Sequence, residues 1–314
     1  MNPKKVRRSG LTMPIVTPRF VDNAWRRGCD YITLDLEDSV PKNRKAFART
    51  LVKEAIPNVS QGGAEAFVRI NHESMQEDTE AVVWPGLKRI KYPKTETAEE
   101  VRALDALISR LEKERGIEPG SIEIDASIET ARGIVNVYEI ASASARIQEF
   151  GATNGGYDMS RDLGVEMFVP FDQFVYLRGE AELAARALGL GVRASPFVPN
   201  TSGSVSDGDR ALRQAKAAWA CGLMVGGGGL NPAVVESHNA GYTPTPDEVG
   251  NAHWVLEQYA LIEKEEKCWA EIEGQVIDRY EAKRAQLTLH WSRLCEARNR
   301  EKKLAVEKVK EGQA

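Results

Sequence analysis

Eight short apolar segments with β-strand character alternate with helical patterns along most of the chain. They begin at Leu11, Tyr31, Ala66, Arg89, Ile122, Arg146, Val192 and Leu223. Strands that alternate with helices form parallel sheets, and eight such units predict an α/β fold of the closed (β/α)8 TIM barrel type. The chain of 314 residues is long enough for this barrel and an appendage. A doubly wound open sheet is the competing prediction.

The character of the sequence changes near Pro246, where charged helical patterns replace the alternation. We therefore predict a catalytic barrel over residues 1–245 and a C-terminal helical extension over residues 246–314. The extension is expected to consist of helices with a break near Glu273 and Gly274. Its last segment carries apolar residues at helical spacing. Such a helix either packs on a neighbouring surface, which suggests a role in oligomerisation, or forms a mobile lid over a site.

The amino-acid composition limits the kinds of partner that the protein is expected to bind. Lys and Arg number 42 and Asp and Glu number 46, so the net charge of −4 gives no basic field for nucleic acid. The basic cluster Lys4, Lys5, Arg7 and Arg8 is expected to be a solvated tail. The four cysteines form no CxxC pair, and no signal peptide or membrane-spanning apolar run is visible. We expect a cytoplasmic protein that binds neither a membrane nor nucleic acid.

Two acidic residues stand where predicted strands end and helices begin. Glu129 lies in SIETARG and Asp158 lies in GGYDMSRDLG. The carboxyl ends of barrel strands gather on one face, where catalytic residues concentrate. Mg²⁺ binds one or two carboxylates and leaves positions for substrate oxygens, and Mn²⁺ accepts similar ligands. The two residues therefore predict a divalent metal site that a chelating oxo or hydroxy acid completes.

A second acidic group follows the second predicted strand, in LDLEDSVP. Asp35, Glu37 and Asp38 are too close together to be buried without a cation or an arginine. Glu37 and Asp38 are candidates for a place beside the metal. Arg69, in the apolar context FVRIN, is expected to pair with one of these carboxylates or to bind a substrate carboxylate or enolate oxygen, and both roles are compatible.

Two weaker candidates for chemistry follow later strands. Lys94, in KYPKTE, suggests a Schiff base, although this would require an amine with a lowered pKa. Gly226 to Gly229 form a glycine run at the end of the last segment. Such a run either lets backbone amides approach a phosphate or makes a tight turn with positive φ.

Several segments together resemble the HpcH/HpaI aldolase and citrate lyase family, on its citrate-lyase-β-subunit-like branch of CoA-ester lyases. The segments that carry the resemblance are RRSGLTMPIVTPRF, GCDYITLDLEDSVPKNRKAFAR, FVRIN, YPKTET, IETARGIVN, GGYDMSRDLG and GQVID. They extend in order from Arg7 to Asp278, so the resemblance covers nearly the whole chain.

The resemblance implies a TIM barrel that binds Mg²⁺ and breaks or makes a carbon–carbon bond. It implies the following roles: metal ligands Glu129 and Asp158; a substrate and thioester contact at Arg69; an acidic pair, Glu37 and Asp38, that holds water on the metal; an acid/base residue of the lid, Asp278; and further substrate contacts at Arg19, Gly156 and Tyr157. It also implies a homotrimer or hexamer in which the lid reaches a neighbouring subunit.

The expected activity is cleavage or formation of a 3-hydroxyacyl-CoA of the malyl-CoA, citramalyl-CoA or citryl-CoA type. The products would be an acyl-CoA and an α-oxo acid. Three alternatives stay open: a CoA-independent metal aldolase that gives pyruvate, a carrier-dependent subunit that resembles the citrate lyase subunit, and a thioesterase using the same site. Departures from the family pattern at Met13–Ile15 and at the glycine run motivate the CoA-independent alternative.

Overall fold

The computed structural model describes residues 5–152, 157–166, 169, 171–193, 206–223 and 226–313. The described chain forms two compact units. The first contains Arg7–Tyr242 and the end of the chain from Lys302, and the second contains Thr243–Glu301. Within the described ranges, no helix combines the length and the apolar character needed to cross a membrane.

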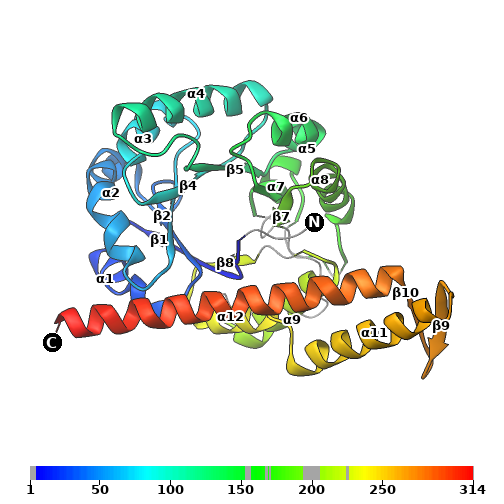
Figure 1. The fold of residues 1–314 in the computed structure, drawn as a ribbon. Coiled ribbons are helices and arrows are strands. Elements are labelled where there is room, and N and C mark those ends of the chain that lie inside the picture. Colours follow the sequence, from blue (N-terminus) through cyan, green and yellow to red (C-terminus); the bar gives the residue numbers. More distant parts are fainter. Residues whose placement is uncertain are drawn as a thin grey trace. The chain divides into compact units, whose positions relative to one another are not determined.

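The first unit is built on eight parallel strands with the order β7-β6-β5-β4-β3-β2-β1-β8 (Figure 1). Their bounds are β1 Ser9–Pro14, β2 Tyr31–Asp35, β3 Glu65–Arg69, β4 Leu87–Tyr92, β5 Glu123–Ile128, β6 Glu149–Ala152, β7 Gly191–Arg193 and β8 Gly227–Gly229. Consecutive strands are neighbours, and β8 returns to pair with β1. This is the strand order of a (β/α)8 barrel, so the predicted fold is confirmed and the doubly wound sheet is excluded.

Helices follow the strands in the expected alternation. In the first unit they are α1 Pro18–Val21, α2 Lys45–Ser60, α3 Met75–Val82, α4 Ala98–Glu114, α5 Ala131–Val135, α6 Val137–Ser142, α7 Tyr157–Leu163, α8 Val175–Leu188, α9 Gly208–Ala220 and α10 Val235–Gly241, with short 3-10 turns at Ala24–Arg27, Lys42–Arg44 and Pro232–Val234. Helix α4 begins with a capping box in which the Thr97 side chain accepts from the Glu100 N–H and Glu100 caps in return.

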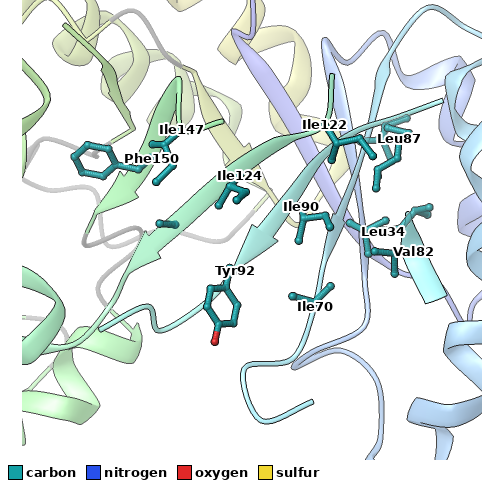
Figure 2. Packing of buried hydrophobic residues seen from close by; sticks show 14 of the residues in the cluster. Leu34, Ile70, Val82, Leu87, Ile90, Tyr92, Ile122, Ile124, Ile147 and Phe150 are labelled. Atoms are coloured by element: carbon teal, nitrogen blue, oxygen red, sulfur yellow. The ribbon is translucent and has the colours of Figure 1, made fainter. Parts of the chain in front are cut away.

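The hydrophobic core lies between the sheet and its helices. Strand residues Leu34, Ile90, Ile124 and Phe150 are fully or almost fully inaccessible to solvent and belong to one cluster with helix residues such as Ile108 (Figure 2). Burying each such side chain contributes about 1.5–3 kcal/mol. This packing holds the strands in register, and so sets the positions at which their carboxyl ends present side chains.

A network of charged side chains fills the interior of the first unit. Arg7 pairs with Glu65 at 2.5 Å and with Glu123 at 2.7 Å, and Phe67 lies within cation–π range of two arginines. Other members of the network include Arg89, Asp125, Glu149 and Arg193. Buried charges are tolerated only when each has a partner, which this network supplies.

Arg7 and Arg8 are therefore not part of the solvated tail that we expected for the basic cluster, whereas Lys5 is exposed and Lys4 lies outside the described residues. Arg7 and Arg8 are 2% and 1% exposed. Arg8 donates to both carboxylate oxygens of Asp30, at 2.9 and 3.0 Å. The tail prediction was wrong for these two arginines because a run of charges carries no information about carboxylates that lie far away along the chain.

Three residues of the glycine run, Gly227–Gly229, form the strand β8 and not a turn. Gly227–Gly229 pair with Ser9–Leu11, and none of the glycines from Gly226 to Gly229 has a positive φ. A Cβ atom on Gly226 would lie 1.8 Å from the carbonyl oxygen of Arg8. Glycine is needed here because β1 and the chain entering β8 approach too closely for a side chain.

The second unit contains α11 Pro246–Lys264, a hairpin of β9 Trp269–Ile272 and β10 Gln275–Asp278, and most of α12 Arg279–Gln313. The expectation of helix throughout the extension was wrong at the hairpin. Glu273 and Gly274 both have positive φ, as a two-residue type I′ hairpin turn requires. The unit has its own small core, which includes Val255, Ile262 and Ile277.

Candidate active site

Ionisable side chains gather at the carboxyl ends of neighbouring strands of the barrel. Asp35 ends β2 and Arg69 ends β3, and these two residues are paired in register. Lys94 follows β4 by two residues, Glu129 follows β5 directly, and Asp158 lies in the first turn of α7, after β6. Contacts among these residues bring them into a single cluster.

Asp35 holds Arg69 in place. The Nε and Nη2 atoms of Arg69 donate to the two carboxylate oxygens of Asp35 at 2.7 and 2.8 Å. Asp35 is fully buried and also accepts from the N–H and hydroxyl of Ser39. Burial opposes ionisation of Asp35, but the hydrogen bonds and charge of Arg69 prevail and lower its pKa. The ion pair expected for Arg69 is present, and it fixes the orientation of the guanidinium before any substrate binds.

Glu37 and Asp38 have different environments. The side chain of Glu37 is 9% exposed, and its Oε2 atom lies 2.8 Å from Nη1 of Arg69. Burial raises the pKa of Glu37, although Arg69 and Lys94 oppose the shift. Asp38 is 56% exposed and lies 3.6 Å from the same nitrogen. Glu37 is thus an internal member of the cluster, whereas Asp38 lies at its rim.

Lys94 links the acidic groups. Its Nζ donates to Glu37 at 2.5 Å and lies 3.8 Å from Oδ1 of Asp158. Its backbone N–H donates to Oε2 of Glu129 at 3.3 Å. Burial disfavours the Lys94 ammonium, but Glu37 and Asp158 prevail and raise its pKa. A protonated, ion-paired amine is a poor nucleophile, which argues against the Schiff base considered above.

The carboxyl group of Glu129 lies in an environment that opposes its ionisation. Burial, together with the charges of Asp158 and Glu37, raises its pKa to about 7. Like-charged carboxylates that share a site resist joint ionisation unless a cation joins them. The charges of Asp158 and Glu37 thus act on Glu129, although the three residues are distant in the sequence.

The segment around Glu129 is shaped by its own sequence. Thr130 caps α5 by accepting from the N–H of Gly133 at 3.0 Å. A Cβ on Gly133 would lie 2.6 Å from the carbonyl oxygen of Thr95, so glycine lets α5 approach the loop that carries Lys94. The N–H of Ala131 donates to Asp162 of α7 at 2.7 Å. That bond ties the helix of Asp158 to the strand end that carries Glu129.

The donor set suits a hard divalent cation. Among the described residues, no group of three or more His, Cys, Asp or Glu side chains could hold a metal by itself. The cluster nevertheless contains five carboxylates, those of Asp35, Glu37, Asp38, Glu129 and Asp158. It contains three cations, Arg69, Lys94 and the exposed Arg161, which lies 3.8 Å from Asp158. The formal excess of two negative charges fits one divalent ion, and carboxylate oxygens are the ligands that Mg²⁺ prefers.

A supporting chain of polar residues escaped the sequence analysis. Lys45 of α2 donates to the backbone carbonyls of Leu36 and Glu37, at 2.7 and 2.6 Å, and to the side chain of Asn71 at 2.6 Å. Asn71 donates in turn to the buried carboxylate of Asp78. These bonds fix the loop that carries Glu37. Nothing in the sequence VPKNRK distinguished Lys45, its last residue, from the surface lysines around it.

The other predicted site residues are placed as follows. Arg19 is exposed on α1, where its guanidinium stacks on Phe20. Tyr157 is half exposed, and Gly156 lies outside the described residues. Asp278 belongs to the second unit, where its Oδ1 accepts from the N–H groups of Tyr280 and Glu281 at the start of α12. The roles of these four residues in substrate binding and acid/base chemistry remain predictions.

The fold and the cluster define a barrel enzyme, since polar groups at the carboxyl ends of barrel strands form the active sites of this architecture. The model of the HpcH/HpaI aldolase/citrate lyase family matches residues 8–225. The chain therefore belongs to the HpcH/HpaI aldolase/citrate lyase family, as the resemblance of its motifs implied.

Relatives of known name cover almost the whole chain. The citrate lyase subunit beta of Leuconostoc mesenteroides is 32% identical over 289 residues, which cover 91% of this chain and 93% of that protein. The L-malyl-CoA/beta-methylmalyl-CoA lyase of Cereibacter sphaeroides is 27% identical over 314 residues, covering 94% and 97%. CitE of Mycobacterium tuberculosis, solved with magnesium, acetoacetate and coenzyme A, superposes with a TM-score of 0.68 at 22% identity, covering 92% and 98%.

Proposed function

We propose that this protein is a Mg²⁺-dependent carbon–carbon lyase that acts on a 3-hydroxyacyl-CoA of the malyl-CoA, citramalyl-CoA or citryl-CoA type. It would release an acyl-CoA and an α-oxo acid, or join them in reverse. The observation that carries the proposal is the cluster of Glu129, Asp158 and Arg69 at the carboxyl ends of the barrel strands. Relatives named as citrate lyase subunits and malyl-CoA lyases support the reaction class.

Glu129 and Asp158 would hold the metal, with Mn²⁺ as a possible substitute for Mg²⁺. A bound ion would polarise the carbonyl oxygen of the α-oxo acid. Glu37 and Asp38 would orient water beside the ion, and Glu37 is held for this by Arg69 and Lys94. The residues that would recognise the acid include Arg19, Gly156 and Tyr157.

Cleavage needs one proton removed from oxygen and one delivered to carbon. A base takes the proton of the 3-hydroxyl group, the bond between carbons 2 and 3 breaks, and the electron pair passes into the thioester as an enolate. Arg69, already oriented by Asp35, would stabilise the enolate oxygen. Asp278 would then protonate carbon 2 to give the acyl-CoA.

The test is an assay of the purified protein with malyl-CoA, citramalyl-CoA and citryl-CoA, each with Mg²⁺ and with EDTA. We expect cleavage of at least one ester with Mg²⁺, and loss of turnover in EDTA and in the Glu129→Ala and Asp158→Ala variants. The exposed variant Glu99→Ala should keep full activity. Full activity in EDTA would refute the proposed mechanism.

A carrier-dependent subunit is the second candidate function. The L. mesenteroides relative is itself named as a subunit of citrate lyase. A protein of that kind would turn over an acyl group presented on a partner and leave soluble CoA esters uncleaved. The same panel therefore separates the two candidates. We further propose a homotrimer or a hexamer, which sedimentation of the purified protein would test.

A further inference from the structure

Lys94 adopts a backbone conformation that is unusual for its residue type. Its φ of 51° lies in the left-handed region. Among the described residues, the other non-glycine positions with positive φ are Glu266 and Glu273, which lie in turns of the second unit. A non-glycine residue in this region costs about 1 kcal/mol or more, so its surroundings must hold it there.

The loop that contains Lys94 is held firmly by its neighbours. The N–H of Thr95 donates to the carbonyl of Ser127 at 3.1 Å, and its hydroxyl donates to the carbonyl of Tyr92 at 2.9 Å. Asn136 donates to the carbonyl of Glu96 at 2.9 Å. The left-handed turn lets one residue present its N–H to Glu129 and its ammonium to Glu37.

Lys94 thus contacts three acidic side chains, of which two are the proposed metal ligands. An exposed lysine pair would contribute little to stability, but the Glu37 side chain in this pair is 9% exposed. Without the lysine charge, the formal negative excess of the cluster would rise from two to three. The strained backbone and the position of the ammonium both indicate that this charge is needed where the metal binds.

We propose that Lys94 is the internal counter-ion of the metal site. In the absence of a divalent ion its ammonium offsets one of the negative charges of Glu37 and Asp158, and it competes with the ion for these carboxylates. Lys94 would therefore stabilise the metal-free protein and weaken metal binding. The proposal rests on the proposed function for the identity of the metal site, but its effect on the metal-free protein does not depend on catalysis.

The experiment compares the wild type with Lys94→Gln and Lys94→Arg. Thermal unfolding is followed in EDTA, and the Mg²⁺ affinity is measured by calorimetric titration. Gln removes the charge and leaves an unbranched side chain, whereas Arg keeps the charge. Lys267→Gln is the matched control, because Lys267 pairs with Glu265 at 2.8 Å on the surface, with both side chains at least 60% exposed.

We expect Lys94→Gln to unfold about 2–4 °C lower in EDTA and to bind Mg²⁺ about three- to ten-fold more tightly, because a competing positive charge is gone. Lys94→Arg and Lys267→Gln should differ little from the wild type. Mg²⁺ binding by Lys94→Gln that is unchanged or weaker would overturn the proposal, as would an unchanged unfolding temperature in EDTA.

Failure of the proposed function gives a different result. A wild type that binds no Mg²⁺, or that binds it equally well after Glu129→Gln, would refute the metal site. The unfolding temperatures in EDTA would still decide whether Lys94 is the counter-ion of the acidic cluster. A Lys94→Gln protein that does not fold, alongside a folded Lys94→Arg protein, would support the requirement for the charge.

Discussion

Proton competition at Glu129 should make Mg²⁺ binding depend strongly on pH. The pKa of this carboxyl is raised to about 7, and a metal ligand must be ionised. With this pKa, the Glu129 carboxyl is ionised in about ten-elevenths of the molecules at pH 8 and in about one-eleventh at pH 6. We therefore expect Mg²⁺ affinity to fall about ten-fold from pH 8 to pH 6, and about half a proton to be released for each ion bound at pH 7.

Calorimetric titration at pH 6, 7 and 8, in buffers that differ in ionisation enthalpy, measures both quantities. Glu129→Gln should remove the pH dependence together with most of the affinity, and the exposed variant Glu99→Gln should change neither. An affinity that stays constant between pH 6 and pH 8, without proton release, would contradict the reasoning.

The same shift has an opposite consequence for the metal-free protein. Its folded state holds the Glu129 proton more tightly than the unfolded state, whose carboxyl titrates near 4.5. Protonated Glu129 therefore stabilises the folded state below about pH 4.5, and this contribution to the free energy of unfolding is lost as the pH rises through about 7. The loss is at most about 3 kcal/mol, and Mg²⁺ should offset it at high pH.

Two further predictions concern Arg69 and the glycine run. Arg69→Lys should lower kcat at least ten-fold in the CoA-ester assay, because lysine cannot reproduce the two parallel bonds to Asp35; activity within two-fold of the wild type would exclude the assigned role. Gly226→Ala should cost about 3 kcal/mol or more in the free energy of unfolding measured in urea, since its Cβ would meet backbone at 1.8 Å. Gly179→Ala, at a helical site with open space, should be neutral or slightly stabilising; equal effects of the two substitutions would refute the close-approach argument.

The architecture of the barrel was predictable because it depends on local patterns. Apolar strand segments such as YITLD and EIDASI and the helical patterns between them follow from side-chain periodicity, and their count determined the fold class. The setting of Glu129 was also visible locally, since IETARG contains the site carboxylate, the capping Thr130 and the close-packed Gly133 in one run.

The hairpin of the second unit was missed although a local signal exists. Residues 269–278 read WAEIEGQVID, in which apolar and polar residues largely alternate around Glu273 and Gly274. A glycine in a two-residue turn between alternating segments favours a hairpin over a broken helix. The charged helices on both sides made the helical interpretation the stronger one.

The sequence by itself determined which residues reach the carboxyl ends of the strands, because periodicity and chain order are local properties. Only the tertiary structure decided how their charges combine. Asp35 meets Arg69 through strand register, Lys94 meets Glu37 across 57 residues, and Arg7, which precedes β1, is buried among carboxylates from three strands. Electrostatic energy depends on distances in space and on burial, and a linear sequence specifies neither until the chain has folded.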